Sequence, residues 1–180
     1  MGFSSGSAQH FVVVLGIILL TTNPLVQARE LRLRKFEKRN EDTEYLECLV
    51  GVARSEINLL EVYGELKLHH HIDNDWTIEF IILRADESDG EYDSLLQIEL
   101  PVCDFMESYY KIFYEQIKDY SNAPEPGTCP LPKGKYRLRD YPLNVHLLKK
   151  FIAPGHYRLK YKLKKDDSPK LYYRMEIKLD

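Results

Sequence analysis

The chain has no large excess of charge of either sign, and this absence argues against one class of partner. Its 180 residues contain 25 Lys and Arg against 28 Asp and Glu, for a formal net charge of −3. Proteins that grip nucleic acid through its phosphates need a basic surface. Whole-molecule charge does not provide one here, so we expect no nucleic-acid partner.

Motifs for catalysis and metal binding are also scarce. The sequence has no phosphate-cradling glycine loop and no His-Glu-x-x-His motif. His69, His70 and His71 are the one evident cluster of metal ligands, with Asp73 and Asp75 nearby. A zinc site needs three or four ligands at suitable spacing, and nothing else in the chain supplies them. We therefore expect no enzyme, no metal site and no cofactor, and interpret the histidines as a solvated strand end.

Long apolar runs are missing except at the N-terminus. Residues 11–20 are wholly apolar, but Thr21 and the residues after it end the run, which is too short for the ~20 residues of a membrane span. Val26 and Ala28 place small residues at the −3 and −1 positions of a signal-peptidase site. We therefore predict a signal peptide over residues 1–28 and a secreted, extracellular protein. A buried core helix is the alternative, because no Lys or Arg precedes the run.

Cysteine is rare, with three in the chain. In a secreted protein this number means one disulfide and a leftover thiol, or an intermolecular bridge. We pair Cys103 with Cys129, because they flank a single helix-plus-loop unit. Cys48 lies in an apolar run, and we expect it to be a buried free thiol rather than a reactive one.

The sequence is rich in the alternation of apolar and polar residues that is typical of β-strands. Thirteen tyrosines suit half-buried strands and the rims of cavities. In the run 76–84 nearly every position after Glu79 is apolar, as in a strand covered on both sides, and Gly64 indicates a bulge or a close backbone approach. Predicted strands cover residues 48–54, 57–69, 76–84, 92–100, 134–138, 156–164 and 170–180.

These strands predict a mainly β fold, an immunoglobulin-like antiparallel sandwich or cup. The last two strands form a hairpin with one wet face. A single domain is expected over residues 41–180. The basic segment 29–40 precedes it as an N-terminal arm or an exposed first strand.

One stretch has a helical period instead. Between residues 104 and 120, apolar residues recur at spacings of three and four, with charged residues on the other side. We predict one amphipathic helix whose apolar side covers the open face or rim of a sheet. Its apolar residues are Met106, Tyr110, Phe113, Tyr114 and Ile117.

The order and spacing of several short motifs resemble one family. The motifs are Cys103-Asp-Phe-Met106, Tyr120-Ser-Asn122, Cys129-Pro130, Gly134-x-Tyr136 and Pro154-Gly155-x-Tyr157. They resemble the insect secreted family catalogued as domain of unknown function 1091, over about residues 95–165 and more loosely over 40–95. That family is similar to the chemosensory Che proteins, which in turn are similar to the ML (lipid-recognition) superfamily of the ganglioside activator protein.

The resemblance implies an ML-like β-cup with no catalytic residues, in which Cys103 and Cys129 match the family's stapled pair. It implies binding of a lipid or another hydrophobic small molecule between two sheets, in chemosensation of pheromones or cuticular lipids, with a membrane receptor ectodomain as a candidate partner. In the alternative, the same residues form the solid core of a secreted protein-interaction module. The pocket candidates are Leu66, Phe80, Met106, Tyr110, Phe113, Tyr114, Ile117, Tyr157, Leu159, Tyr161, Tyr173 and Met175.

Overall fold

The computed structural model describes residues 31–56, 59–144 and 153–180, and these residues form a mainly β fold. The predicted signal peptide lies outside the described residues. Within them, no helix has the length and apolar character to cross a membrane. The elements are β1 (Leu31–Glu41), β2 (Leu46–Glu56), β3 (Leu59–Leu68), β4 (Trp76–Ala85), β5 (Asp93–Pro101), α2 (Val102–Glu107), α3 (Tyr109–Ile117), the 3-10 turn η1 (Lys118–Tyr120), β6 (Gly134–Asn144), β7 (Gly155–Lys165) and β8 (Ser168–Leu179).

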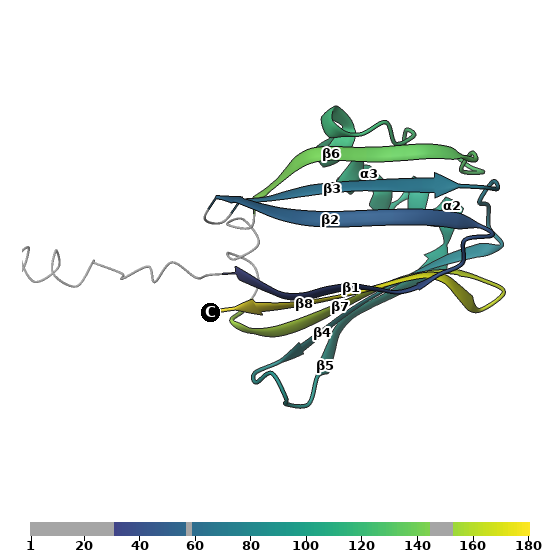
Figure 1. The fold of residues 1–180 in the computed structure, drawn as a ribbon. Coiled ribbons are helices and arrows are strands. Elements are labelled where there is room, and N and C mark those ends of the chain that lie inside the picture. Colours follow the sequence, from purple (N-terminus) through teal and green to yellow (C-terminus); the bar gives the residue numbers. More distant parts are fainter. Residues whose placement is uncertain (1–30, 57–58, 145–152) are drawn as a thin grey trace, which may run out of the picture.

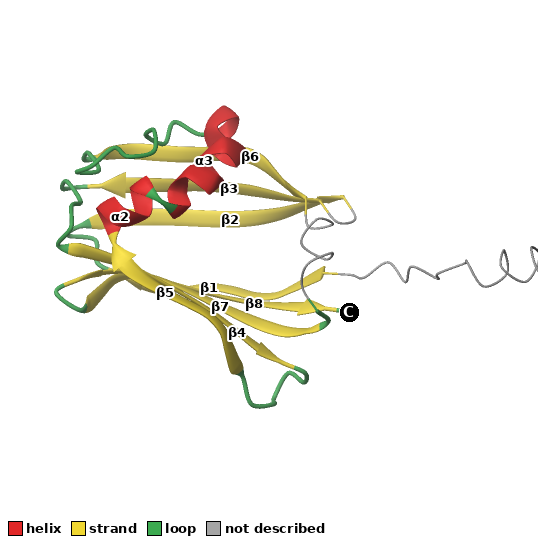
Figure 2. Ribbon diagram, turned by 180° about the vertical axis from the view of Figure 1, so that it is seen from behind, coloured by secondary structure: helices red, strands yellow, loops and turns green. Residues whose placement is uncertain are grey.

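The strands make two antiparallel sheets, which confirms the predicted sandwich. One sheet has the order β1-β8-β7-β4-β5 and the other β2-β3-β6. On one side, β1 and β8 contact β2 directly. On the other side, the helical segment runs from the end of β5 to β6 (Figure 2). The sheets lie close together where β2 begins and diverge toward the opposite end (Figure 1). We call these two ends of the described strands the closed end and the open end.

The C-terminal hairpin has the register that its alternation predicts. Leu159 lies opposite Met175, and Tyr161 lies opposite Tyr173. Residues directly opposite each other on antiparallel strands share one face. Apolar side chains therefore gather on the inner face of the five-stranded sheet, and Lys and Arg on its outer face. The inner rows are Leu171–Leu163–Ile78, Tyr173–Tyr161–Phe80 and Met175–Leu159–Ile82.

The sequence predicted that β4 is covered on both of its faces, and the structure differs. The strand lies inside its sheet, between β7 and β5, but Ile81 and Leu83 on its outer face are only partly buried. The prediction of cover on both sides was therefore wrong for this strand. On the same outer face, Glu79 is buried and pairs with the Lys162 ammonium at 2.5 Å, which compensates the buried charge.

Hydrogen bonds from side chains of the five-stranded sheet join it to the backbone of β2 along one side of the sandwich. β2 is an edge strand, so backbone groups on its outer edge need partners beyond the ladder. The Cys48 N–H donates to the Glu41 carboxylate at 2.6 Å. The Cys48 carbonyl accepts from Lys38 Nζ and from Tyr173 Oη, each at 3.0 Å. Because these three partners come from β1 and β8, the edge of β2 is tied to the other sheet.

Gly64 has both of the features expected of it. The pairing of β3 with β6 shifts between Val62 and Gly64. A Cβ on Gly64 would lie 3.0 Å from the Leu49 carbonyl oxygen, so a side chain there would push against the closely passing neighbouring strand.

The predicted single helix is divided in the structure. α2 ends at Glu107, Ser108 follows with φ −110° and ψ −90°, and α3 begins at Tyr109. The Ser108 N–H donates to the carbonyls of Asp104 and Phe105, and its hydroxyl also donates to the Asp104 carbonyl. Serine hydroxyls that bond to a preceding carbonyl compete with regular helix continuation. The periodic pattern was right about the helical segment and wrong about its continuity.

The buried core lies mainly at the closed end. Its largest cluster joins the start of β2, the start of β4 and the helical segment, and Trp76 is one of its most buried side chains. A second, smaller cluster near the open end consists of Tyr157, Ile177 and Leu179. Among the described residues, the larger buried cluster therefore lies where the sheets converge.

Candidate ligand-binding site

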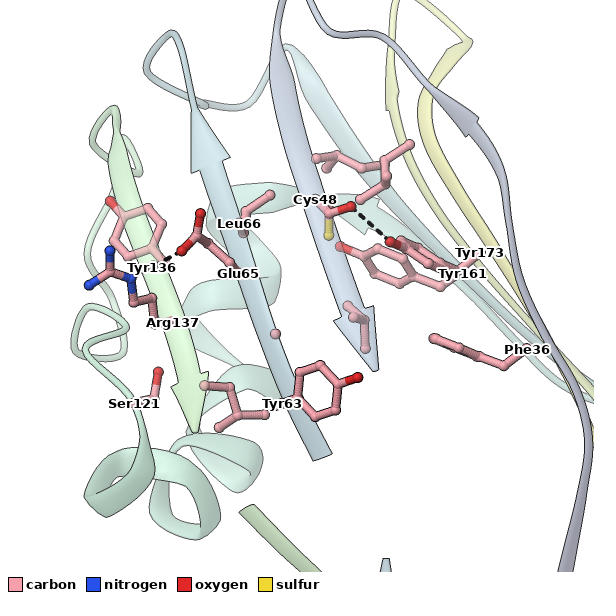
Figure 3. A pocket seen from close by; sticks show the side chains of 15 residues that line it. Phe36, Cys48, Tyr63, Glu65, Leu66, Ser121, Tyr136, Arg137, Tyr161 and Tyr173 are labelled. Atoms are coloured by element: carbon pink, nitrogen blue, oxygen red, sulfur yellow. Dashed lines mark hydrogen bonds and ion pairs between the residues drawn. The ribbon is translucent and has the colours of Figure 1, made fainter. Parts of the chain in front are cut away.

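A predominantly apolar pocket with a volume of about 380 Å³ lies between the two sheets. This volume is within the range of small-molecule sites. We call it the intersheet pocket, and Figure 3 shows its lining. From the five-stranded sheet it is lined by Phe36, Tyr161, Leu163, Leu171 and Tyr173, and from the other sheet by Cys48, Val50, Tyr63, Gly64, Glu65, Leu66, Tyr136, Arg137 and Leu138, with Ser121 after η1.

Aromatic side chains make the wall on the five-stranded sheet. Tyr161 on β7 lies directly opposite Tyr173 on β8. The ring of Phe36 on β1 stacks on Tyr173 with 5.4 Å between ring centroids and 14° between ring planes. Three neighbouring strands therefore contribute adjacent rings to one wall.

The wall on the three-stranded sheet follows from its register. Val50 on β2 pairs with Gly64 on β3, which pairs with Leu138 on β6. Leu66 continues the same face, between Cys48 and Tyr136. Gly64, at the centre of these residues, has no side chain to extend into the pocket, and this leaves room for a ligand.

Charged groups at the edge of the pocket are paired with one another. Glu65 on β3 lies 2.5 Å from Lys135 Nζ and 3.1 Å from Arg137 Nε, both on β6. Hydrogen bonds from Lys135 and then Arg137 lower the pKa of Glu65, outweighing partial desolvation. The carboxylate thus joins the two strands at neutral pH and does not offer an unpaired charge to the pocket.

This pairing predicts an acid dependence of stability. Because the folded state lowers the pKa of Glu65, its stabilising effect is present above the ordinary glutamate pKa of about 4.3 and is lost as the pH falls through the folded value. We expect Glu65→Gln to melt at a lower temperature than the parent protein at pH 7. The difference should shrink below about pH 4. A difference in melting temperature that stays constant from pH 7 to pH 3 would contradict this role.

The Cys48 thiol in the pocket is unreactive. Cys48 is buried and free, as predicted, and burial raises the pKa of its thiol. A protonated thiol is a poor nucleophile. The other two cysteines form the predicted bond between Cys103 and Cys129, with Cα atoms 5.5 Å apart. This bond ties the start of α2 to the loop before β6.

The strand residues predicted for a pocket all lie on inner sheet faces. Leu66, Tyr161 and Tyr173 line the intersheet pocket. The remaining four share the inner face of the five-stranded sheet with Tyr161 but do not line this pocket. They are Phe80, Tyr157, Leu159 and Met175.

The helical residues predicted for a pocket lie elsewhere. Met106 and Tyr110 are buried in the main core, where Tyr110 Oη donates to the Pro124 carbonyl at 2.9 Å. Tyr114 and Ile117 pack against the same core. Phe113 is 55 % exposed. The helical segment therefore covers the core, and none of these five residues lines the intersheet pocket.

Sequence reasoning missed most residues of the second wall. Val50 and Cys48 alternate with Leu49, which is 62 % exposed, and this alternation was the available signal. Phe36 lies between Lys35 and Glu37 in a charged stretch of the sequence, and only its register opposite Met175 brings it to the inner face. Which sheet edges meet is set by tertiary contacts, so the pairing of the two walls had no local signal.

The histidine triplet has ordinary surroundings. His69 Nε2 lies 3.1 Å from the Glu47 carboxylate, and the His70 ring lies 5.8 Å from that of Tyr45. In the part of the chain that the structure describes, no three His, Cys, Asp or Glu side chains gather in a way that could hold a metal ion.

Comparison with known protein families finds a match over part of the chain. No curated protein gives a significant match. The family model described as "Protein of unknown function (DUF1091)" matches residues 78–159, from β4 into β7. The resemblance to this family therefore extends over the middle of the chain, from β4 into β7.

Proposed function

We propose that this protein is a secreted, non-enzymatic binder of a lipid or another hydrophobic small molecule. The observation that carries the proposal is the intersheet pocket, an apolar space between two antiparallel sheets. Transfer of apolar surface from water into such a pocket stabilises a complex by roughly 25 cal/mol per Å². No directional chemistry is needed for this gain, so the ligand's hydrocarbon part supplies most of the affinity.

A route for the ligand follows from the divergence of the sheets. Leu159, Met175 and Ile82 continue the inner face from Tyr161 toward the open end, and all three are only partly buried. A long hydrocarbon chain extending from the pocket would cover these side chains. Binding would thereby complete burial that the protein alone leaves unfinished.

The titratable groups of the pocket favour binding over catalysis. Glu65 and Arg137 form an ion pair with each other at the edge of the pocket. Burial raises the pKa values of Cys48, Tyr161 and Tyr173, so these groups are neutral at physiological pH. General acid–base catalysis works best with groups that titrate near the operating pH. The described pocket residues therefore suit a carrier.

The family resemblance supports a finer version of the proposal. Similarity of the DUF1091 family to the Che proteins and the ML superfamily favours a carrier of pheromones or cuticular lipids in insects, with a receptor ectodomain as its protein partner. This version shares its physical basis with the general proposal, because both need an occupied pocket.

Adjacent residues of β2 offer a matched test. Val50 lines the intersheet pocket, whereas Leu49 points to the outer face. We expect Val50→Trp to fill the pocket and weaken binding of the apolar fluorescent dye N-phenyl-1-naphthylamine by at least about tenfold, or 1.4 kcal/mol. Leu49→Trp adds the same ring outside the pocket and should leave the affinity unchanged. Fluorescence titration of both variants measures this.

Native mass spectrometry of the protein from insect cells provides a second reading. A co-purifying lipid that Val50→Trp loses and Leu49→Trp retains would support the carrier. The proposal fails if the parent protein is empty and neither dye nor lipid raises its melting temperature, since a ligand of the folded state must stabilise it. Stabilisation by a receptor ectodomain alone would then favour the protein-interaction module.

A further inference from the structure

Among the four tyrosines that line the intersheet pocket, Tyr161 alone has both an inward-facing side chain and a hydroxyl without a hydrogen-bond partner among the described residues. Tyr173 Oη donates to the Cys48 carbonyl, and Tyr136 Oη donates to the Pro132 carbonyl. Tyr63 lies on the outer side of its sheet, with its ring over Gly51. The remaining hydroxyl is that of Tyr161 on β7.

Tyr161 has aromatic neighbours on both sides within its sheet. Across the sheet, Tyr161 lies between Phe80 and Tyr173. In Figure 3 its ring extends beside that of Tyr173 toward Cys48. Tyr173 is already engaged with the Cys48 backbone, and a thiol is a weak hydrogen-bonding group. The Tyr161 hydroxyl is thus a good hydrogen-bond donor on the pocket wall that a bound molecule can use.

An unpaired hydroxyl distinguishes between ligands. A pure hydrocarbon seated against Tyr161 would exclude water and leave the hydroxyl without a partner, which disfavours binding. A ligand that places an oxygen against Tyr161 would replace the lost water. Sites with a polar group that must be satisfied reject analogues that lack the matching atom.

The charges around the pocket restrict the ligand further. The cation among the lining residues, Arg137, is held by Glu65 at 3.1 Å. Burial raises the pKa of Tyr161, so its phenol stays a neutral donor. A carboxylate headgroup would therefore enter an apolar space without an available counter-charge, which is unfavourable.

We infer that the intersheet pocket takes an uncharged lipid bearing an oxygen acceptor, such as an alcohol, aldehyde, ketone or ester, and that this oxygen accepts a hydrogen bond from Tyr161 Oη. The hydrocarbon part then extends along Leu159 and Met175 toward the open end. This inference rests on the proposed function and specifies the ligand of the same pocket.

Tyr161→Phe tests the inference, because it removes the hydroxyl and keeps the ring. The ligands are dodecane, 1-dodecanol and dodecanoate, each measured by displacement of N-phenyl-1-naphthylamine. We expect the parent protein to bind dodecanol more tightly than dodecane or dodecanoate. Tyr161→Phe should weaken dodecanol binding about five- to tenfold, the effect of one hydrogen bond, and should leave dodecane unchanged or slightly tighter. Tyr172→Phe, next to Tyr173 but on the outer face beside Lys162, is the control and should change neither.

The outcomes separate this inference from the proposed function. If the parent protein binds neither dye nor any of the three ligands, the carrier proposal itself fails. If the parent protein binds dodecane as tightly as dodecanol, or Tyr161→Phe weakens both equally, the carrier proposal stands and the role of Tyr161 is wrong. Tightest binding of dodecanoate would overturn the uncharged ligand. The ligand order in the parent protein decides these points even if the variant folds poorly.

Discussion

Replacement of both bridging cysteines, Cys103→Ala with Cys129→Ala, is expected to lower the free energy of unfolding by about 3.5 kcal/mol. The bond joins residues 26 apart in sequence, and its loss frees that loop in the unfolded chain. In the folded protein it holds the first turn of α2 against the loop before β6. Urea unfolding of the variant and the parent protein, followed by tryptophan fluorescence, measures the difference.

The parent protein supplies the control for this variant. Dithiothreitol should destabilise the parent protein by about the same amount and should leave the double variant unaffected. If the loss is below 1 kcal/mol, the helical segment is held by the packing of Met106 and Tyr110 alone. Because no helical residue lines the intersheet pocket, the folded fraction of the variant should still bind N-phenyl-1-naphthylamine. Loss of dye binding by folded variant would mean that the helical segment shapes the pocket.

The disulfide is one of the features that local sequence patterns predicted correctly. Strand alternation specified the inner face of β7 and β8, because a period of two leaves few choices once one face is apolar. The pairing of Cys103 with Cys129 followed from the single helical unit between them. The break at Ser108 was not predicted, because the helical period continues through it and a local hydroxyl–carbonyl bond interrupts the backbone.

The pocket was harder to predict than the sheets. Tyr161 and Tyr173 were identified because strand alternation marks inward residues. Val50 and Phe36 reach the same pocket only because β2 meets β1 and β8 at the sheet edges, a contact between strands far apart in any local pattern. Phe113 fits the apolar side of the helical pattern but is exposed, because α3 covers the core with Tyr110, Tyr114 and Ile117 instead. Local periodicity predicts which residues face inward, but the position of a void depends on how the layers are joined.

Trp76→Ala is expected to lower the free energy of unfolding by about 3–5 kcal/mol, as for other buried aromatic side chains. Trp76 is 2 % exposed at the start of β4, where the sheets converge. Its ring meets that of Tyr45 edge-on, with 5.5 Å between centroids. Removal leaves a void that this closely packed end cannot easily collapse to fill. Thermal and urea unfolding followed by far-ultraviolet circular dichroism would measure the loss, since the variant has no tryptophan.

Two further variants make this prediction specific to burial at the closed end. Trp76→Phe keeps a ring in the core and should lose clearly less stability, while Leu49→Ala, at an exposed position, should stay within about 0.5 kcal/mol of the parent protein. A small effect of Trp76→Ala would mean that stability resides near Tyr157 and Leu179, at the end where the sheets diverge. A ligand could then enter only by disturbing the part that holds the fold together. A large effect assigns stability to the closed end, which leaves the open end free to receive a hydrocarbon chain without unfolding.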